Sequence, residues 1–250
     1  MTAPTTGAAA PALRVRRQAA FEGAALLRNG EQLLVAIVLP ALAMLVLAWA
    51  DSPDLGARRI DVIVPGVLGL AIVSTAFTGQ AIATAFDRRN GVLRLLGTTP
   101  LGRDGLLLGK VGAVTAVLGI HLVVLAALGL ALGWRPEPVG VLPALLTVGF
   151  GAGCFVALGL LVAGVLRAEA VLALANVLWV LFLGLGLLLP ARLLPGPLAD
   201  LAPWLPSGAL GEALRDALVA GSWPVGHWLV LLVWGGLAAA VAVRTFRWSD

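Results

Sequence analysis

A glycine-rich stretch that ends in a lysine is the part of this chain closest to a nucleotide-binding motif. The sequence Gly105-Leu-Leu-Leu-Gly109-Lys110-Val111 is similar to a phosphate-binding loop, in which glycine amides surround the phosphates and the lysine contacts them. The motif has four residues between its glycines and a Ser or Thr after the lysine. Here there are three residues and Val111, and no strand precedes them. We therefore expect no nucleotide binding in this chain.

Ser207 and His227 are the pair that could form a hydrolytic site, with His121 as a spare base. A serine nucleophile needs an imidazole and an acid that orients the ring, and no acid is clearly placed for that role. Cys154 is the single cysteine, and no cluster of Cys and His offers a metal site. The sequence thus predicts no catalytic residue, no metal and no cofactor in this chain, which is not expected to be an enzyme.

The remaining polar candidates lie within apolar stretches. An ionisable residue inside a membrane span is a functional-site hypothesis by default, so His121 is a candidate for contact with a translocated molecule, together with Gln80 and Asn176. The alternative is a structural His121, because a neutral imidazole bonded to a neighbouring helix avoids the roughly 2.5–3.5 kcal/mol cost of a charge. Both interpretations stay open.

Composition identifies the class of protein that must hold these residues. The 250-residue chain is 60% hydrophobic and 12% charged, about half the charged fraction of a soluble domain. Its mean hydropathy is +1.00, so we expect an integral membrane protein. The residue usage, with one Lys and many Ala, Gly, Leu and Arg, suggests a bacterial source and hence the plasma (inner) membrane.

Six apolar stretches have about the length that a membrane-spanning helix needs. They are residues 33–50, 62–86, 111–134, 139–166, 170–189 and 225–243, and none contains Asp, Glu, Lys or Arg. If the N-terminus is cytoplasmic, 12 of the 17 Lys and Arg residues lie on the cytoplasmic side and 5 outside. The prediction is an all-α membrane protein whose two termini and residues 87–110 face the cytoplasm.

Structure can also be predicted for three segments outside the spans. Residues 1–12 are expected to form a disordered tail, and residues 13–32 either an amphipathic helix in the inner interface or a solvated basic leader. Residues 207–221 have helical signals, with Ser207 as a potential N-cap. We expect a short helix resting on the outer membrane face, which either caps the exit of a pathway or is simply a helical loop.

The loop over residues 87–110 carries five of the basic residues and predicts a helix, a turn and a second helix. Thr99 and Pro100 are a suitable N-cap and first-turn pair for the second helix, since proline needs no donor there. Five glycines make the loop helices unstable alone but allow close packing, so the loop needs a partner surface.

This loop resembles the corresponding loop of the permease subunits of ABC-2-type transporters, a family of six-span membrane proteins. The matching positions are Asp87, Arg88, Gly91, Leu93, Leu96, Thr99, Pro100, Leu108, Gly109 and Lys110. The segments 26–34 and 205–215 also look like the family's first-span entry and outer helix. One departure is Arg94, where the family often has Glu.

The resemblance implies that the loop holds a coupling helix seated on a separate ATPase subunit, which binds ATP and Mg. The residues it assigns to ATPase coupling are Asp87, Arg88, Arg89, Gly91, Leu93, Arg94, Leu96, Thr99 and Pro100. Two permease halves, either two copies of this chain or this chain and a related one, would form the transporter with two ATPases. Charge reversal at Arg88 and Arg89 is expected to weaken ATPase docking without changing membrane insertion.

The expected function is the permease of an ATP-driven exporter with an amphipathic or hydrophobic cargo, because the spans lack a charged site. Two alternatives stay open. One is a related permease dedicated to a biosynthetic cargo such as a polysaccharide or a haem-maturation component. The other is a membrane assembly or scaffold protein, which would tolerate loss of the 87–110 loop.

Overall fold

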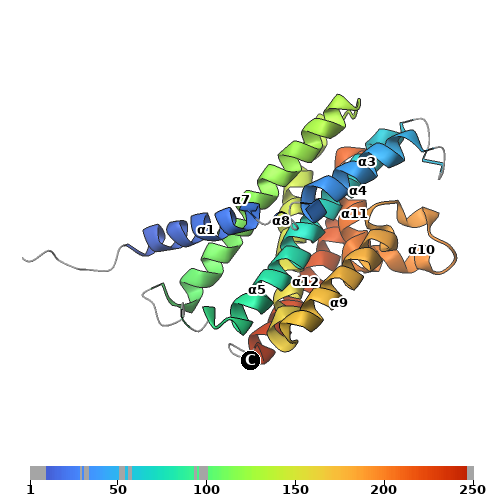
Figure 1. The fold of residues 1–250 in the computed structure, drawn as a ribbon. Helices are drawn as coiled ribbons and strands as arrows, with labels where there is room; N and C mark the ends of the chain where they lie inside the picture. Colours follow the sequence, from blue (N-terminus) through green and yellow to red (C-terminus); the bar gives the residue numbers. More distant parts are fainter. Residues whose placement is uncertain are drawn as a thin grey trace, which may run out of the picture.

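The computed structural model describes residues 10–28, 30, 34–50, 54–55, 58–92, 95 and 101–246. Every regular element in these ranges is helical, which confirms the predicted all-α fold (Figure 1). The elements are α1 (Pro11–Arg28), η1 (Leu34–Val38), α3 (Leu39–Trp49), α4 (Arg59–Ile72), η2 (Val73–Gly79), α5 (Gln80–Arg89), α7 (Gly102–Ala131), η3 (Pro138–Gly140), α8 (Val141–Val165), α9 (Ala168–Phe182), η4 (Leu183–Leu187), η5 (Ala191–Leu193), α10 (Leu198–Leu201), η6 (Ala202–Trp204), α11 (Pro206–Leu218) and α12 (Val225–Thr245).

Five helices in the described ranges are long and apolar enough to cross a membrane. They are Arg59–Arg89, Leu108–Ala131, Pro138–Val165, Ala168–Leu187 and Val225–Thr245, each close to a predicted span. The predicted first span, 33–50, corresponds to the shorter apolar helix Ala36–Trp49. The structure therefore supports a multi-pass membrane protein, while six crossings and a cytoplasmic N-terminus stay predictions.

The helix formed by α4, η2 and α5 is the centre of the bundle. Its apolar stretch is 89% buried, against 22–33% for the other four long spans. It packs against α3, α7, α8, α9 and α11, and Phe77 from its middle meets Phe155 and Phe182 edge to face. Because this helix packs against most of the others, a displacement of either of its ends would also displace the helices in contact with it.

Three of the apolar helices contain a π-helical turn. These turns are η1, η2 and η4, and η2 lies in the middle of the central helix. At η4 the chain also leaves helical geometry, since Gly186 has a φ of 81° that side chains rarely adopt. Such turns occur often at functional positions of helices.

The helix before the last span is present, but its predicted position on the membrane surface is wrong. α11 packs against α4, α8, α12 and η4, and all of its residues except Glu212 and Asp216 are buried. Small residues allow this approach: a Cβ at Gly208 would lie 2.0 Å from the Ala202 carbonyl oxygen. The prediction assigned the leucines to one face and the charged residues to another, and it did not use the small residues that let the helix enter the bundle.

Arg215 ties α11 to the end of η4. Its guanidinium donates to the carbonyl oxygens of Gly186, at 2.6 Å, and Leu187, at 3.1 Å, and it also forms an ion pair with Glu212 at 3.1 Å. The Glu212 carboxylate in turn accepts the Ala191 amide at 2.7 Å. One ion pair thus satisfies backbone groups that the irregular chain after η4 leaves without helical partners.

Acid is expected to weaken this network. Burial alone would raise the pKa of Glu212, but the Arg215 charge and the hydrogen bond from Ala191 hold that pKa below its usual range. The ionised carboxylate therefore contributes stability above about pH 4.3, the ordinary value for Glu, and this contribution is lost as the pH falls through the lower folded-state pKa. We expect the melting temperature of the detergent-solubilised protein to fall more steeply with acid than that of Glu212→Gln. Parallel pH profiles would contradict the assignment.

The predicted amphipathic segment at the N-terminus is the helix α1, which crosses the half of α7 nearest Lys110 (Figure 1). It begins at Pro11, two residues before the predicted start of that segment. The predicted tail lies mainly in residues 1–9, outside the described ranges. Because α1 is seated on a helix of the bundle, it is part of the protein's packing as well as amphipathic.

Candidate coupling site

Three consecutive residues at the end of α5 contact three different neighbours. Asp87 pairs with Lys110 of α7, Arg88 donates to the end of α8, and Arg89 pairs with Glu169 of α9. Consecutive residues of an α-helix point about 100° apart, so three in a row reach different sides. The start of the 87–110 loop is therefore fixed to most of the bundle at once.

Lys110 is the centre of a buried ion-pair cluster. Its Nζ donates to Asp87 Oδ2 at 2.7 Å and to Glu22 Oε2 of α1 at 2.9 Å, and the side chain is 4% exposed. Gln18 Nε2 donates to the other Glu22 oxygen at 3.0 Å. A buried ammonium ion is tolerated only with such partners, so the cluster holds α1, α5 and α7 in one arrangement.

Arg88 faces into the protein. Its side chain is buried, and the guanidinium donates to the Ala163 carbonyl oxygen at 2.7 Å and to the Leu166 carbonyl oxygen. These are carbonyls of the last turn of α8, which have no partner within that helix. The arginine predicted to touch an ATPase therefore caps a neighbouring helix in this conformation.

Arg89 and Gly91 lie at the surface, as a docking role requires. The Arg89 guanidinium pairs with Glu169 and lies 4.5 Å from the centre of the Phe86 ring. Gly91 has a φ of 72° and ends the helix, and its amide donates to the Arg88 carbonyl oxygen. The remaining coupling candidates, Leu93, Arg94, Leu96, Thr99 and Pro100, lie outside the described residues.

The second helix predicted for the loop is not a separate element beyond residue 101. Gly102 begins α7, which continues without interruption through Lys110 to Ala131. The predicted loop 87–110 is thus shorter at both ends, because α5 extends to Arg89 and α7 begins at Gly102; we call the connecting residues 90–101 the 90–101 loop. The helical conformation also excludes a phosphate-binding loop at Gly105–Lys110, because helix amides inside α7 are directed at helix carbonyls.

His121 is fully buried opposite η2. Its Nδ1 lies 2.9 Å from Thr75 Oγ1, and the side chain is 1% exposed. Within the described part of the chain, neither His121 Nε2 nor the buried Thr78 hydroxyl has a hydrogen-bond partner. A structural role explains the contact of His121 Nδ1 with Thr75, but it does not explain the buried Nε2.

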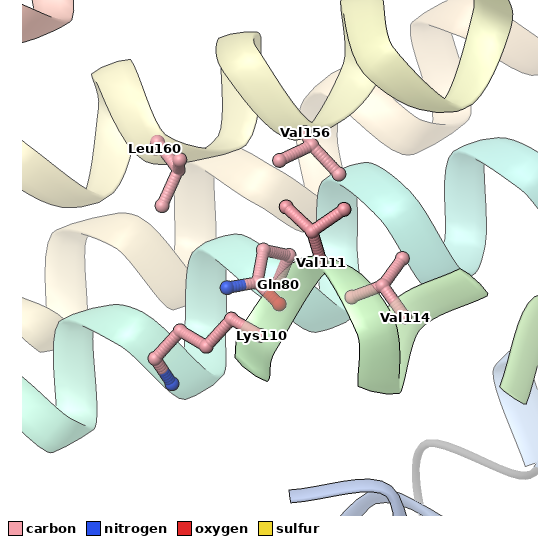
Figure 2. Close-up of a pocket in the computed structure, with 6 residues that line it drawn as sticks. All are labelled: Gln80, Lys110, Val111, Val114, Val156 and Leu160. Atoms are coloured by element: carbon pink, nitrogen blue, oxygen red, sulfur yellow. The ribbon is translucent and has the colours of Figure 1, made fainter. Parts of the chain in front are cut away.

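Gln80 lies beside a small cavity between α5, α7 and α8 (Figure 2). The cavity has a volume of about 20 Å³, and its lining residues are Gln80, Lys110, Val111, Val114, Val156 and Leu160. Gln80 Nε2 donates to Thr84 Oγ1 at 3.0 Å. A space of this size can hold about one water molecule, so it is no cargo site in this conformation.

Asn176 is separate from the other two pathway candidates. It lies on the exposed face of α9, whereas Gln80 and His121 are buried along the central helix. The structure therefore does not bring the three predicted pathway residues into one site. An exposed amide in the middle of an apolar helix faces either lipid or another subunit.

Several residues with structural or electrostatic roles were not found by sequence reasoning. Glu22 and Lys110 had no assigned partner, and Asp61, outside the predicted second span, is buried and accepts the Arg135 amide at 3.1 Å. Asp216 lies 3.5 Å from His227 Nε2, although no acid was expected there. Burial raises the pKa of Asp216, and the neighbouring histidine opposes that shift. Pairing between residues so far apart in sequence leaves no local pattern to detect.

The residues suspected of hydrolysis have different partners. The Ser207 hydroxyl donates to the Leu185 carbonyl oxygen at 3.1 Å, while His227 faces Asp216. Among the described residues no group of three or more His, Cys, Asp or Glu is arranged to hold a metal ion. The Lys110 cluster, in contrast, joins α1, α5 and α7 through its two ion pairs.

Comparison with known proteins identifies the family of this chain. A family model described as ABC-2 family transporter protein matches residues 52–244, which is most of the chain and includes all five long spans. A search of curated proteins gave no match. The resemblance first noted in the loop residues thus extends over the membrane domain, and the chain belongs to the ABC-2 transporter family, as a permease subunit of an ABC transporter.

Proposed function

We propose that this permease is one half of an ATP-driven exporter in the bacterial plasma membrane. The 90–101 loop docks on a separate ATPase subunit, which binds ATP and Mg. A second copy of the chain completes the transmembrane pathway, and the cargo is amphipathic or hydrophobic. Family membership supports the ATPase partner and the membrane setting, and the apolar spans support the cargo class.

The proposal rests mainly on the contacts that the residues flanking the loop make with the membrane helices. Asp87, Arg88 and Arg89, directly before the loop, contact α7, α8 and α9, and Lys110, which lies in the helix after the loop, holds Asp87. A partner that displaces the loop would therefore displace several membrane helices together. A simple surface loop needs no such connections, whereas a transporter driven from outside the membrane does.

The test is recovery of an ATPase with the tagged permease from native membranes in mild detergent. We expect an ATPase subunit to copurify with the native chain and to be lost when residues 91–100 are replaced by a flexible Gly/Ser linker of equal length. Membrane insertion and the elution volume serve as controls for folding. Absence of any ATPase with the folded native chain would refute the proposal and favour a scaffold role.

Separate charge reversals at Arg88 and Arg89 refine this test, because the two arginines face different ways. Arg89→Glu should lower ATPase recovery several-fold with little loss of stability, since an exposed ion pair contributes about 0–1 kcal/mol. Arg88→Glu should lower the melting temperature, because it places a carboxylate among the carbonyls of α8. Equal effects of both changes on stability and recovery would contradict the different roles assigned to them.

A further inference from the structure

α1 lies in a groove of α7 that is built from glycines. A Cβ at Gly109 would lie 2.7 Å from Gln18 Cγ, and a Cβ at Gly112 would lie 3.3 Å from the Ala19 Cβ. Further along the same contact, Leu26 of α1 forms an apolar cluster with Ala113 and Val117. For Gly109, the partner surface that the glycines of residues 87–110 were expected to need is therefore a helix of the same chain.

The ion pair between Lys110 and Glu22 adds an electrostatic contact between α7 and α1 beside the glycine contacts. The two residues are 88 positions apart, and the same ammonium group also holds Asp87 at the other end of the loop. The Asp87–Lys110 pair alone would be enough to close the base of the loop. Adding Glu22 brings α1 into the same cluster, so α1 is connected directly to the segment on which the ATPase would act.

We propose that α1 is a transmitting element of the transporter and that Lys110 is the positioning residue that couples it to the loop. This inference rests on the proposed function. When the ATPase displaces the 90–101 loop, α1, the end of α5 and the start of α7 move as one body held by Lys110. α1 then transfers the displacement along the membrane surface toward the first apolar helix.

A disulfide between α1 and α7 tests whether the two helices move together. In a Cys154→Ala background, the pair Ala19→Cys and Gly112→Cys would place two Cβ atoms near the 3.3 Å separation seen for Gly112, a few tenths of an ångström short of the usual disulfide range. We expect the bond to form equally in the nucleotide-free and the ATP/vanadate-trapped permease–ATPase complex, with ATP turnover within twofold of the reduced complex. Loss of turnover that reductant restores, or a several-fold lower yield in the trapped state, would overturn the proposal.

Lys110→Met tests the ionic link itself. We expect it to reduce the ATP turnover of the complex at least fivefold while the ATPase still copurifies, and we expect the 19–112 disulfide to restore most of that turnover. Arg17→Met, at an exposed position on α1, is the matched control and should have no effect. A folded Lys110→Met complex with normal turnover, or one that the disulfide fails to rescue, would refute the role of Lys110.

Hydrogen exchange separates this proposal from the proposed function, because it needs no ATPase. In the permease alone, Lys110→Met should increase amide exchange in residues 11–28 at least tenfold and leave α8 and α12 unchanged. Unchanged exchange in α1 would refute the link even if an ATPase is recovered with the native chain. If exchange rises but no ATPase copurifies with the native chain, the link stands as a contact and both the proposed function and the transmitting role fall.

Discussion

Replacing Arg215 with leucine is expected to remove most of the stability of the folded permease. The change leaves the partly buried Glu212 without its counter-ion and leaves the carbonyls of Gly186 and Leu187 without donors. Removing one member of a buried ion pair typically costs about 3–5 kcal/mol, a large part of the ~5–15 kcal/mol that stabilises a typical protein. We expect poor recovery of monodisperse protein and a strongly lowered melting temperature in detergent.

Two further variants test whether the loss of stability comes from the specific contacts of Arg215. Arg192→Leu removes an exposed arginine from the same region and should leave the melting temperature nearly unchanged. Arg215→Lys keeps the charge but not the planar fork, so it should recover only part of the stability. A normal melting temperature for Arg215→Leu would show that water or lipid satisfies these carbonyls instead.

Gly140→Ala is expected to have the second large effect, because there is no room for a side chain at this position. A Cβ would lie 1.8 Å from the Ala217 carbonyl oxygen, so backbone must move on one side of the contact. The same junction contains the hydrogen bond from the Glu137 amide to the Leu218 carbonyl oxygen, which joins the turn before α8 to the end of α11. We expect destabilisation at or above the top of the ~1–3 kcal/mol range for overpacked cores.

Gly149→Ala is the matched control for this effect. It lies in α8, and a Cβ there would meet no atom within 4 Å. Alanine is the better helix former by roughly 0.8–1 kcal/mol in peptides, so stability should stay the same or rise slightly. Thermal unfolding of the two variants side by side measures the difference, and similar melting temperatures would contradict the tight contact at Gly140.

The membrane helices could be predicted from the sequence because each is a long apolar run bounded by charge or proline. The run predicted at 225–243 is the helix Val225–Thr245, and the run at 139–166 is the helix Pro138–Val165. Hydrophobic length decides both the existence and the approximate ends of such helices. The first span is less clear, since its apolar helix is only Ala36–Trp49 in the described residues.

The position of α11 could not be predicted, because it depends on residues that carry no hydrophobic signal. Gly208 and Gly211 allow the helix to approach other backbone segments closely. The helical pattern places Arg215 on the charged face of this helix, although its side chain is buried inside the protein. Such a placement is decided by shape and by hydrogen bonds to distant carbonyls, and neither is visible in a hydrophobic pattern.

For the candidate site, the sequence could select a segment but not the directions of its side chains. Motif reasoning selected Asp87, Arg88 and Arg89 together, but the structure turns them toward different neighbours, with Arg88 buried. The direction of a side chain depends on which helices surround it, and the neighbours of Arg88 and Arg89 come from positions 75 to 80 residues away. A local motif identifies a segment and leaves open which of its residues face a partner.

The π-helical turn in the central helix has a consequence for how its side chains can be re-aimed. A π turn holds one residue more than an α turn, so moving it one position along the helix rotates the residues it passes by about 100°. In η2 these residues include Ser74, Thr75 and Thr78, of which the first two now bond to Trp179 and His121. Migration of this turn would exchange the hydroxyl groups facing α7 and α9 while both ends of the helix stay in place. Movement of the π turn would therefore rotate these side chains about the helix axis without a hinge and without unfolding.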